Sequence, residues 1–248
     1  MPVKALVATV SLIILLKNGT PIGVGNGFFY ARGDRLFLVT TQHLCCNEKA
    51  RVRPDTLRLP LHTDPYDVTQ QADFEVPLYH GAERLWQVHA THPEADLALI
   101  ELDKAQLQKR FFVRAWSKES LLPHASRFEP GDDVLILGYP LLVRDEQQKL
   151  PIFRYAMAAS TYRALFRGQP LFLTDAPLPP ETRGSPVIAD PQNAEGNDMG
   201  NTKHATETMY YLVGVHSGGV DPQLTGDKGI RLGAAWDAEL VEDIAAQF

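Results

Sequence analysis

Cysteine is scarce in this sequence. The 248 residues contain only two, Cys45 and Cys46, and these are neighbours in the chain. Adjacent cysteines do not readily reach the separation and side-chain directions of a disulfide, so we expect no structural bridge. Small secreted domains usually carry several disulfides. The cysteine content therefore favours a reducing compartment, and we expect a cytoplasmic protein.

An excess of positive charge is also missing. Lys and Arg number 24 against 30 Asp and Glu, which gives a formal net charge of −6 at pH 7. Nucleic-acid-binding domains commonly carry a basic patch or stripe, and none is visible in this sequence. We therefore expect no nucleic-acid partner.

The sequence has no apolar run long enough to cross a membrane as a helix. The most apolar run, residues 5–16, is shorter than the roughly 20 residues that such a helix needs. It has the length of a signal-peptide core, but Lys17 and the pair Asn18-Gly19 follow it instead of a cleavage site of small residues. We interpret it as a buried first strand that ends in an Asn-Gly turn. An export signal is the alternative, and no membrane partner is expected.

Glycine and proline, by contrast, are plentiful, with 18 of each spread over the whole length. This distribution indicates many turns and short strands. Polar, turn-rich residues predict loops at residues 47–72 and 190–208. Apolar and β-branched segments predict strands at residues 7–16, 22–30, 36–40, 74–79, 85–90, 97–100, 134–137, 153–166, 171–174, 187–188 and 210–216.

The pattern changes at two places along the chain. Residues 103–130 show no clear periodicity and separate two β-rich halves. We expect a first domain at residues 1–116, a connection at 117–130 and a second domain at 131–248. Near the end, apolar residues recur at helical spacing and predict one amphipathic helix packed on the second half; they are Trp236, Leu240, Val241, Ile244 and Phe248.

Five segments of the sequence carry motifs. They are VTTQH at residues 39–43, ADLALI at 95–100, VLILGYP at 134–140, PPETRGSPV at 179–187 and VGVHSGG at 213–219. In this order, they resemble the segments of trypsin-like serine peptidases that carry the general base, the buried aspartate, the start of the second barrel, the nucleophile and the substrate-pairing strand. Their order matters because similar triads occur on unrelated folds in other orders. The chain resembles the trypsin-like peptidase domains of bacteria.

The resemblance implies an all-β fold of two six-stranded antiparallel β-barrels with a C-terminal α-helix. It places His43 as the general base and Asp96 as the carboxylate that orients it, both in the N-terminal barrel. It implies that Ser217, Gly218 and Gly219 bind substrate, with the Ser217 hydroxyl touching Asp96. A peptide or protein would then bind in the cleft between the barrels.

The nucleophile loop departs from the family pattern at two positions. Arg183 stands where the family has its serine, and a guanidinium remains protonated and has no lone pair with which to attack a carbonyl. Glu181 stands where the family has a glycine whose N–H group faces the oxyanion. A side chain there restricts the backbone, and a carboxylate repels the developing charge. The oxyanion hole, formed by Glu181 and Arg183, is therefore expected to be impaired.

No neighbouring residue is expected to replace the missing serine. Thr182 and Ser185 lie one and two residues away, which displaces their hydroxyls by several ångströms, whereas attack needs contact within roughly 3–3.5 Å. We expect the Arg183 side chain in or beside the cleft near His43, with Glu181 or Asp175 as its partner.

Cys45 and Cys46 are interpreted as small buried residues rather than as nucleophiles. His89 and His92 have no matching carboxylate or cysteine cluster, so neither a metal nor another cofactor is expected.

Three functions remain open from the sequence. The first, which we favour, is a peptidase homologue without catalysis that binds a peptide or protein partner. The second is an active serine endopeptidase whose nucleophile loop aligns differently or was altered. The third is an interaction domain of a larger assembly.

Overall fold

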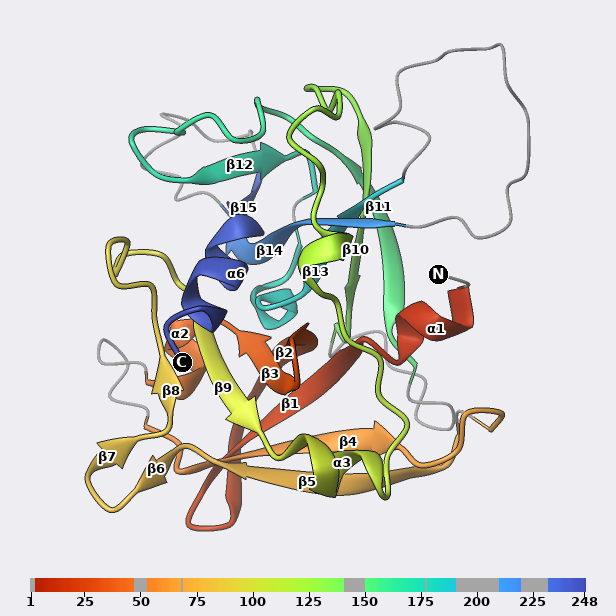
Figure 1. Ribbon diagram of the computed structural model, residues 1–248, viewed down its shortest axis with the longest axis vertical. Helices are drawn as coiled ribbons and strands as arrows, with labels where there is room; N and C mark the ends of the chain where they lie inside the picture. Colours follow the sequence, from red (N-terminus) through yellow and green to blue (C-terminus); the bar gives the residue numbers. More distant parts are fainter. Residues whose placement is uncertain are drawn as a thin grey trace.

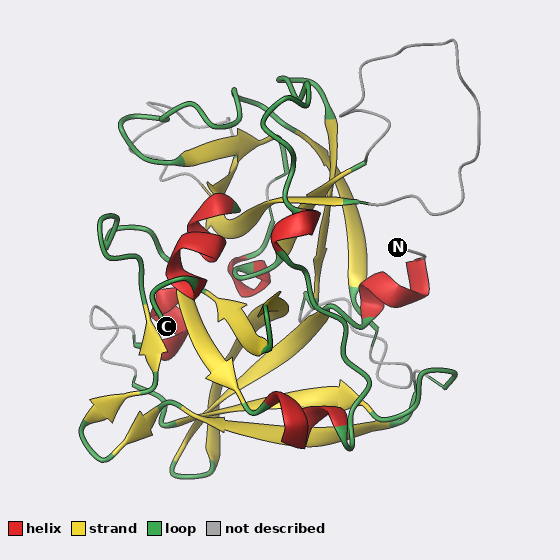
Figure 2. Cartoon of the chain, in the orientation of Figure 1, coloured by secondary structure: helices red, strands yellow, loops and turns green. Residues whose placement is uncertain are grey.

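The computed structural model describes residues 3–46, 53–67, 69–140, 150–176, 178–190, 210–219 and 232–248. Two antiparallel sheets lie one above the other, the first from the N-terminal half and the second from the C-terminal half (Figure 1). The C-terminal helix lies between them (Figure 2). Among the described residues, no helix is both long and apolar enough to span a membrane.

The first sheet has seven strands in the order β5-β4-β1-β2-β3-β9-β8. Strands β1 and β2 form a hairpin whose two turn residues are Asn18 and Gly19. Their φ angles of 51° and 74° suit a two-residue turn, so the expected Asn-Gly turn is confirmed. Beside this sheet, a short hairpin pairs β6 (Tyr79–His80) with β7 (Glu83–Arg84). The strands of the sheet are β1 (Val10–Lys17), β2 (Thr20–Arg32), β3 (Arg35–Thr40), β4 (Thr56–His62), β5 (Gln71–Pro77), β8 (Trp86–Gln87) and β9 (Ala98–Leu102).

The second sheet has six strands in the order β11-β10-β13-β14-β15-β12, all antiparallel to their neighbours. The two curled sheets confirm the expected all-β, two-barrel fold, with one strand more than expected in the first. The strands of the second sheet are β10 (Asp133–Gly138), β11 (Ile152–Met157), β12 (Leu171–Thr174), β13 (Pro186–Ala189), β14 (Tyr211–Gly219) and β15 (Gly233–Asp237).

The helices are short. The chain begins with α1 (Val3–Val7), α2 (Gln42–Cys45) follows β3, and α6 (Glu239–Ala245) is the predicted C-terminal helix. In the sequence between β9 and β10, the chain forms α3 (Lys104–Gln108) and a 3-10 turn, η1 (Lys118–Ser120). A second 3-10 turn, η3 (Pro180–Thr182), precedes β13.

Strand β4 lies in a segment that we expected to be a loop. Leu57, Leu59 and Leu61 are buried, whereas the residues between them are half-exposed. This is the period of two that a half-buried strand requires. The sequence did not indicate this strand, because a charged residue, Arg58, and a proline, Pro60, stand between its leucines. In the fold, Arg58 forms an ion pair with Glu75 on the neighbouring β5, at a distance of 2.9 Å.

Three other strand predictions were too long. The strand expected at residues 85–90 is only β8, with two residues. The first strand begins at Val10 rather than at residue 7, because the preceding residues form α1. Strand β11 ends at Met157, whereas we expected a strand to residue 166. Arg163 lies beyond that end with a φ of 59°, a left-handed conformation that a strand does not contain. The loop expected at residues 190–208 lies almost wholly outside the described residues.

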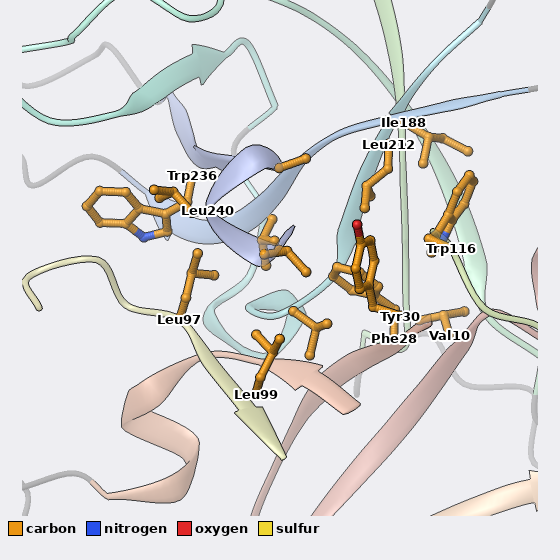
Figure 3. Packing of buried hydrophobic residues seen from close by; sticks show 14 of the residues in the cluster. Val10, Phe28, Tyr30, Leu97, Leu99, Trp116, Ile188, Leu212, Trp236 and Leu240 are labelled. Carbon is orange, nitrogen blue, oxygen red and sulfur yellow. The ribbon is translucent and has the colours of Figure 1, made fainter. Parts of the chain in front are cut away.

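Helix α6 packs against both halves of the molecule, not only against the second as expected. Leu240 is buried in one cluster with Leu97 and Leu99 of the first half and with Trp236 of the second (Figure 3). The Tyr30 hydroxyl on β2 donates a hydrogen bond of 2.7 Å to Glu242 of α6. The helix therefore joins the two sheets through apolar packing and through Glu242, which accepts hydrogen bonds from Tyr30 and Arg32 of β2.

Asp237 ends β15 and is a buried carboxyl group at this junction. Its side chain is about 6% exposed, and Oδ1 has no hydrogen-bond partner. Burial, and secondarily the charge of Glu239, raise its pKa to about 7. Because the ordinary pKa is 3.8, the folded protein binds a proton here that the unfolded chain releases.

We expect Asp237→Asn to stabilise the protein increasingly as the pH rises. Below pH 3.8 the carboxyl is protonated in both states and costs nothing; the cost grows as the pH rises to about 7 and stays constant above it. The gain in free energy of unfolding at pH 8 is at most on the order of 4 kcal/mol. Urea unfolding between pH 4 and 8 measures it, with Asp34→Asn as an exposed control. A gain that does not depend on pH would contradict this cause.

Candidate active site

His43 and Asp96 form a hydrogen-bonded pair at the end of two neighbouring strands. Thr40 of β3 pairs with Ala98 of β9, so residues just after β3 and just before β9 lie side by side. His43 Nδ1 is 2.6 Å from Asp96 Oδ2, and the His43 backbone N–H donates to Oδ1 at 2.9 Å. Their side chains are 25% and 27% exposed. A carboxylate at Nδ1 places the ring proton there and leaves Nε2 with a lone pair, as a general base requires.

The loop of residues 179–185 is attached to the first barrel through Asn26 of β2. The buried Asn26 side chain donates from Nδ2 to the Glu181 carbonyl at 2.6 Å, and its Oδ1 accepts from the Tyr139 N–H at 2.7 Å. Its backbone N–H donates to the Arg183 carbonyl at 3.1 Å. Our sequence interpretation missed this residue. Its only signal was a polar residue between two glycines, Gly25 and Gly27, in an otherwise apolar strand.

Gly184 allows the loop to approach β2 and β14 closely. Its φ is +86°, and a Cβ at this position would collide with the Asn26 carbonyl oxygen. Its N–H donates to the His216 carbonyl at 2.8 Å, and the His216 N–H donates to the Ser185 carbonyl at the same distance. Two backbone hydrogen bonds thus join this loop to β14.

Arg183 extends its side chain along β14. Nε and Nη2 lie against Gly218, where a Cβ would overlap the guanidinium. Nε is buried without a hydrogen-bond partner. The expected ion pair with Glu181 or Asp175 does not form, and no carboxylate of the described residues lies within 4.0 Å of this guanidinium. Asp175 does not pair with Arg183 because its Oδ1 instead accepts a hydrogen bond of 2.7 Å from the Met157 N–H.

The backbone N–H of Arg183 points into its own turn. It donates to the Pro180 carbonyl at 3.2 Å, and the Thr182 N–H donates to the Pro179 carbonyl at 3.0 Å. An oxyanion hole needs N–H groups directed at the place where the oxyanion forms. One of the two groups expected to form the hole is therefore engaged within η3.

Neither flanking hydroxyl contacts His43 through a hydrogen bond. Thr182 Oγ1 donates to the Pro179 carbonyl at 2.6 Å. Ser185 is fully buried, and its Oγ lies against Gly138 without a hydrogen-bond partner.

The three residues expected to bind substrate end β14. Gly218 is buried and has a φ of +102°, Ser217 is half-exposed, and Gly219 is exposed. No hydrogen bond from Ser217 to Asp96 is found in the described part of the chain, where the Asp96 carboxylate accepts both of its hydrogen bonds from His43.

His216 is a buried polar residue that the sequence interpretation treated only as part of a strand. Neither of its ring nitrogens has a hydrogen-bond partner, and burial together with the Arg183 cation lowers its pKa to about 4. Thr174 of β12 is likewise fully buried with its hydroxyl unpaired. Both side chains border the Cα of Gly233.

The two cysteines are free thiols beside this site. Cys45 is fully buried, and burial raises the pKa of its thiol, so the reactive thiolate is disfavoured. In the described ranges, no group of three His, Cys, Asp or Glu side chains is arranged to hold a metal ion.

Comparison with known protein families identifies one match. The model of the trypsin-like peptidase domain family matches residues 25–195, which include His43, Asp96 and the loop of Arg183. A search of curated proteins gave no match. The matched segment is more than half of the chain, and it contains β3 and β9, which position the pair, and the loop of residues 179–185. The chain belongs to the trypsin-like peptidase domain family.

Proposed function

We propose that this protein is a trypsin-like peptidase homologue that has lost catalysis and binds a peptide or protein partner between its barrels. The observation that carries the proposal is that Arg183, which we assign to the nucleophile position, has its N–H bonded to the Pro180 carbonyl. The guanidinium has no lone pair for attack, and the bonded N–H does not face an oxyanion. A cytoplasmic location belongs to the same proposal and is supported by the two free cysteines.

The retained His43–Asp96 pair is compatible with this function. Asp96 accepts a backbone N–H as well as the imidazole, so the pair also fixes the start of α2. Removing either residue would leave a polar partner unpaired, which gives the pair a structural value without catalysis.

An active serine endopeptidase is the second candidate, and the geometry of this same pair is what favours it. A nucleophile would then have to come from Ser185 or Thr182. The Ser185 hydroxyl is fully buried against Gly138, and the Thr182 hydroxyl is bonded to a carbonyl of its own turn. Either would require the loop to leave its contacts with Asn26.

Fluorophosphonate labelling distinguishes the two candidates. We expect the purified protein to remain unlabelled at concentrations that label trypsin completely, because no activated serine faces His43. The variant His43→Ala serves as the control and should behave identically. Labelling of the native chain that is lost in His43→Ala would establish an active serine and overturn the proposal.

A further inference from the structure

We propose that the ligand of this protein presents a carboxylate, which binds the guanidinium of Arg183 beside His216 and Thr174. The inference rests on the proposed function and names the chemistry of the ligand that the site accepts. The proposed carboxylate site depends on the loop of residues 179–185 in this protein, because an arginine stands there at the position that we assign to the nucleophile.

The first observation is the uncompensated charge of Arg183. Its side chain is half-buried along β14, its Nε is wholly buried, and no carboxylate of the described residues reaches it. Removing a cation from water is costly unless an anion or hydrogen-bond acceptors replace the water. A guanidinium presents its N–H groups in a planar fork that matches the two oxygens of a carboxylate.

The second observation is that the neighbouring buried polar groups are also unpaired. His216 has two ring nitrogens without partners, and the Thr174 hydroxyl has none, although both side chains are fully buried. Buried polar atoms are almost always hydrogen-bonded, so unpaired groups gathered in one place indicate a missing partner. A neutral imidazole and a hydroxyl can each donate one hydrogen bond to an anion.

The third observation places these groups beside the strand that ends at Gly219. The Arg183 guanidinium lies on Gly218, and the His216 backbone pairs with Gly184 and Ser185 of the loop. The Arg183 charge is close enough to lower the pKa of His216. The cation and the unpaired imidazole therefore belong to one site, at the junction of the loop with β14.

The carboxylate of a peptide has two sources, an acidic side chain and the free C-terminus, and both offer the same two oxygens. The experiment uses four alanine pentapeptides with acetylated N-termini. Two carry a C-terminal amide and have Glu or Gln at the centre. The other two contain only alanine and end in a free carboxylate or an amide. Binding is followed by NMR titration of the native protein.

We expect one acidic peptide to bind at least about tenfold more tightly than its neutral counterpart, because charge-assisted hydrogen bonds to a guanidinium are worth that much. The pair that shows the difference identifies the source. Arg183→Gln should remove the preference, and Arg183→Lys, which keeps the charge without the fork, should retain part of it. Arg110→Gln, which removes an exposed arginine just after α3, should leave it unchanged.

The failures of the two proposals are distinguishable. Equal affinity for acidic and neutral peptides would overturn the carboxylate inference and leave peptide binding intact. An acidic preference that survives in Arg183→Gln would place the carboxylate elsewhere and also overturn the inference. If none of the four peptides binds at millimolar concentration, peptide binding fails together with the inference.

Discussion

The double variant Arg183→Ser, Glu181→Gly is expected to hydrolyse an activated peptide ester at least about 10²-fold faster than the native chain. The serine would stand three residues before Pro186 of β13, where the family places its nucleophile. His43 is already held by Asp96 with Nε2 free to take the serine proton. In an active peptidase, removal of one oxyanion donor alone lowers the rate about 10²–10³-fold. The double variant regains both a nucleophile and a donor, so its rate should rise by at least about 10²-fold, the lower end of this range.

Glycine at position 181 is needed because η3 holds the Arg183 N–H against the Pro180 carbonyl. A residue without a Cβ lets the peptide between positions 180 and 181 rotate, which releases that N–H toward the substrate. The single variant Arg183→Ser should therefore gain less than the double variant. This difference separates the effect of the nucleophile from that of the oxyanion hole.

The control is the triple variant that also carries His43→Ala, in which the gain should disappear. Initial rates with a chromogenic peptide ester measure the series, and fluorophosphonate labelling counts the active serines. A double variant that folds but gains neither activity nor labelling would show that position 183 does not correspond to the nucleophile.

The sequence allowed the fold class and the order of the site segments to be predicted. The strands around residues 10–40 and 134–137 are apolar runs bounded by turn residues, and the apolar residues after Trp236 recur at helical spacing, so the sequence alone indicates both kinds of element. The His43–Asp96 contact followed from placing the two motifs in one barrel, because paired strands bring their ends together.

Other features depend on contacts that a sequence pattern does not express. The side chain of Arg183 runs along β14 rather than to Glu181 or Asp175, and this direction is decided by the space above Gly218. The unpaired state of His216 depends on what surrounds it in three dimensions, not on its neighbours in the sequence.

Asn26 is the clearest example of a residue whose importance only the tertiary structure shows. It is fully buried on β2, and it hydrogen-bonds residues 113 to 155 positions away in the chain. Its side chain pairs one N–H and one carbonyl that would otherwise be buried without partners. It therefore holds the 179–185 loop and the end of β10 against the first barrel.

We expect Asn26→Ala to lower the free energy of unfolding by about 3–5 kcal/mol. The change leaves the Glu181 carbonyl and the Tyr139 N–H unpaired, at about 1–3 kcal/mol each, and adds a small cavity. Urea unfolding measures the loss, and Gln108→Ala, at an exposed position on α3, should stay within about 0.5 kcal/mol of the native value.

A second variant tests whether the loss comes from the loop. Asn26→Asp keeps the acceptor for the Tyr139 N–H but places a carboxylate oxygen against the Glu181 carbonyl. At neutral pH it should be destabilised, and at acid pH the protonated carboxyl can donate to that carbonyl and recover part of the loss. If Asn26→Asp is as stable as the native protein at pH 7, the hydrogen bond to Glu181 does not anchor the loop, because repulsion at this contact would then cost nothing.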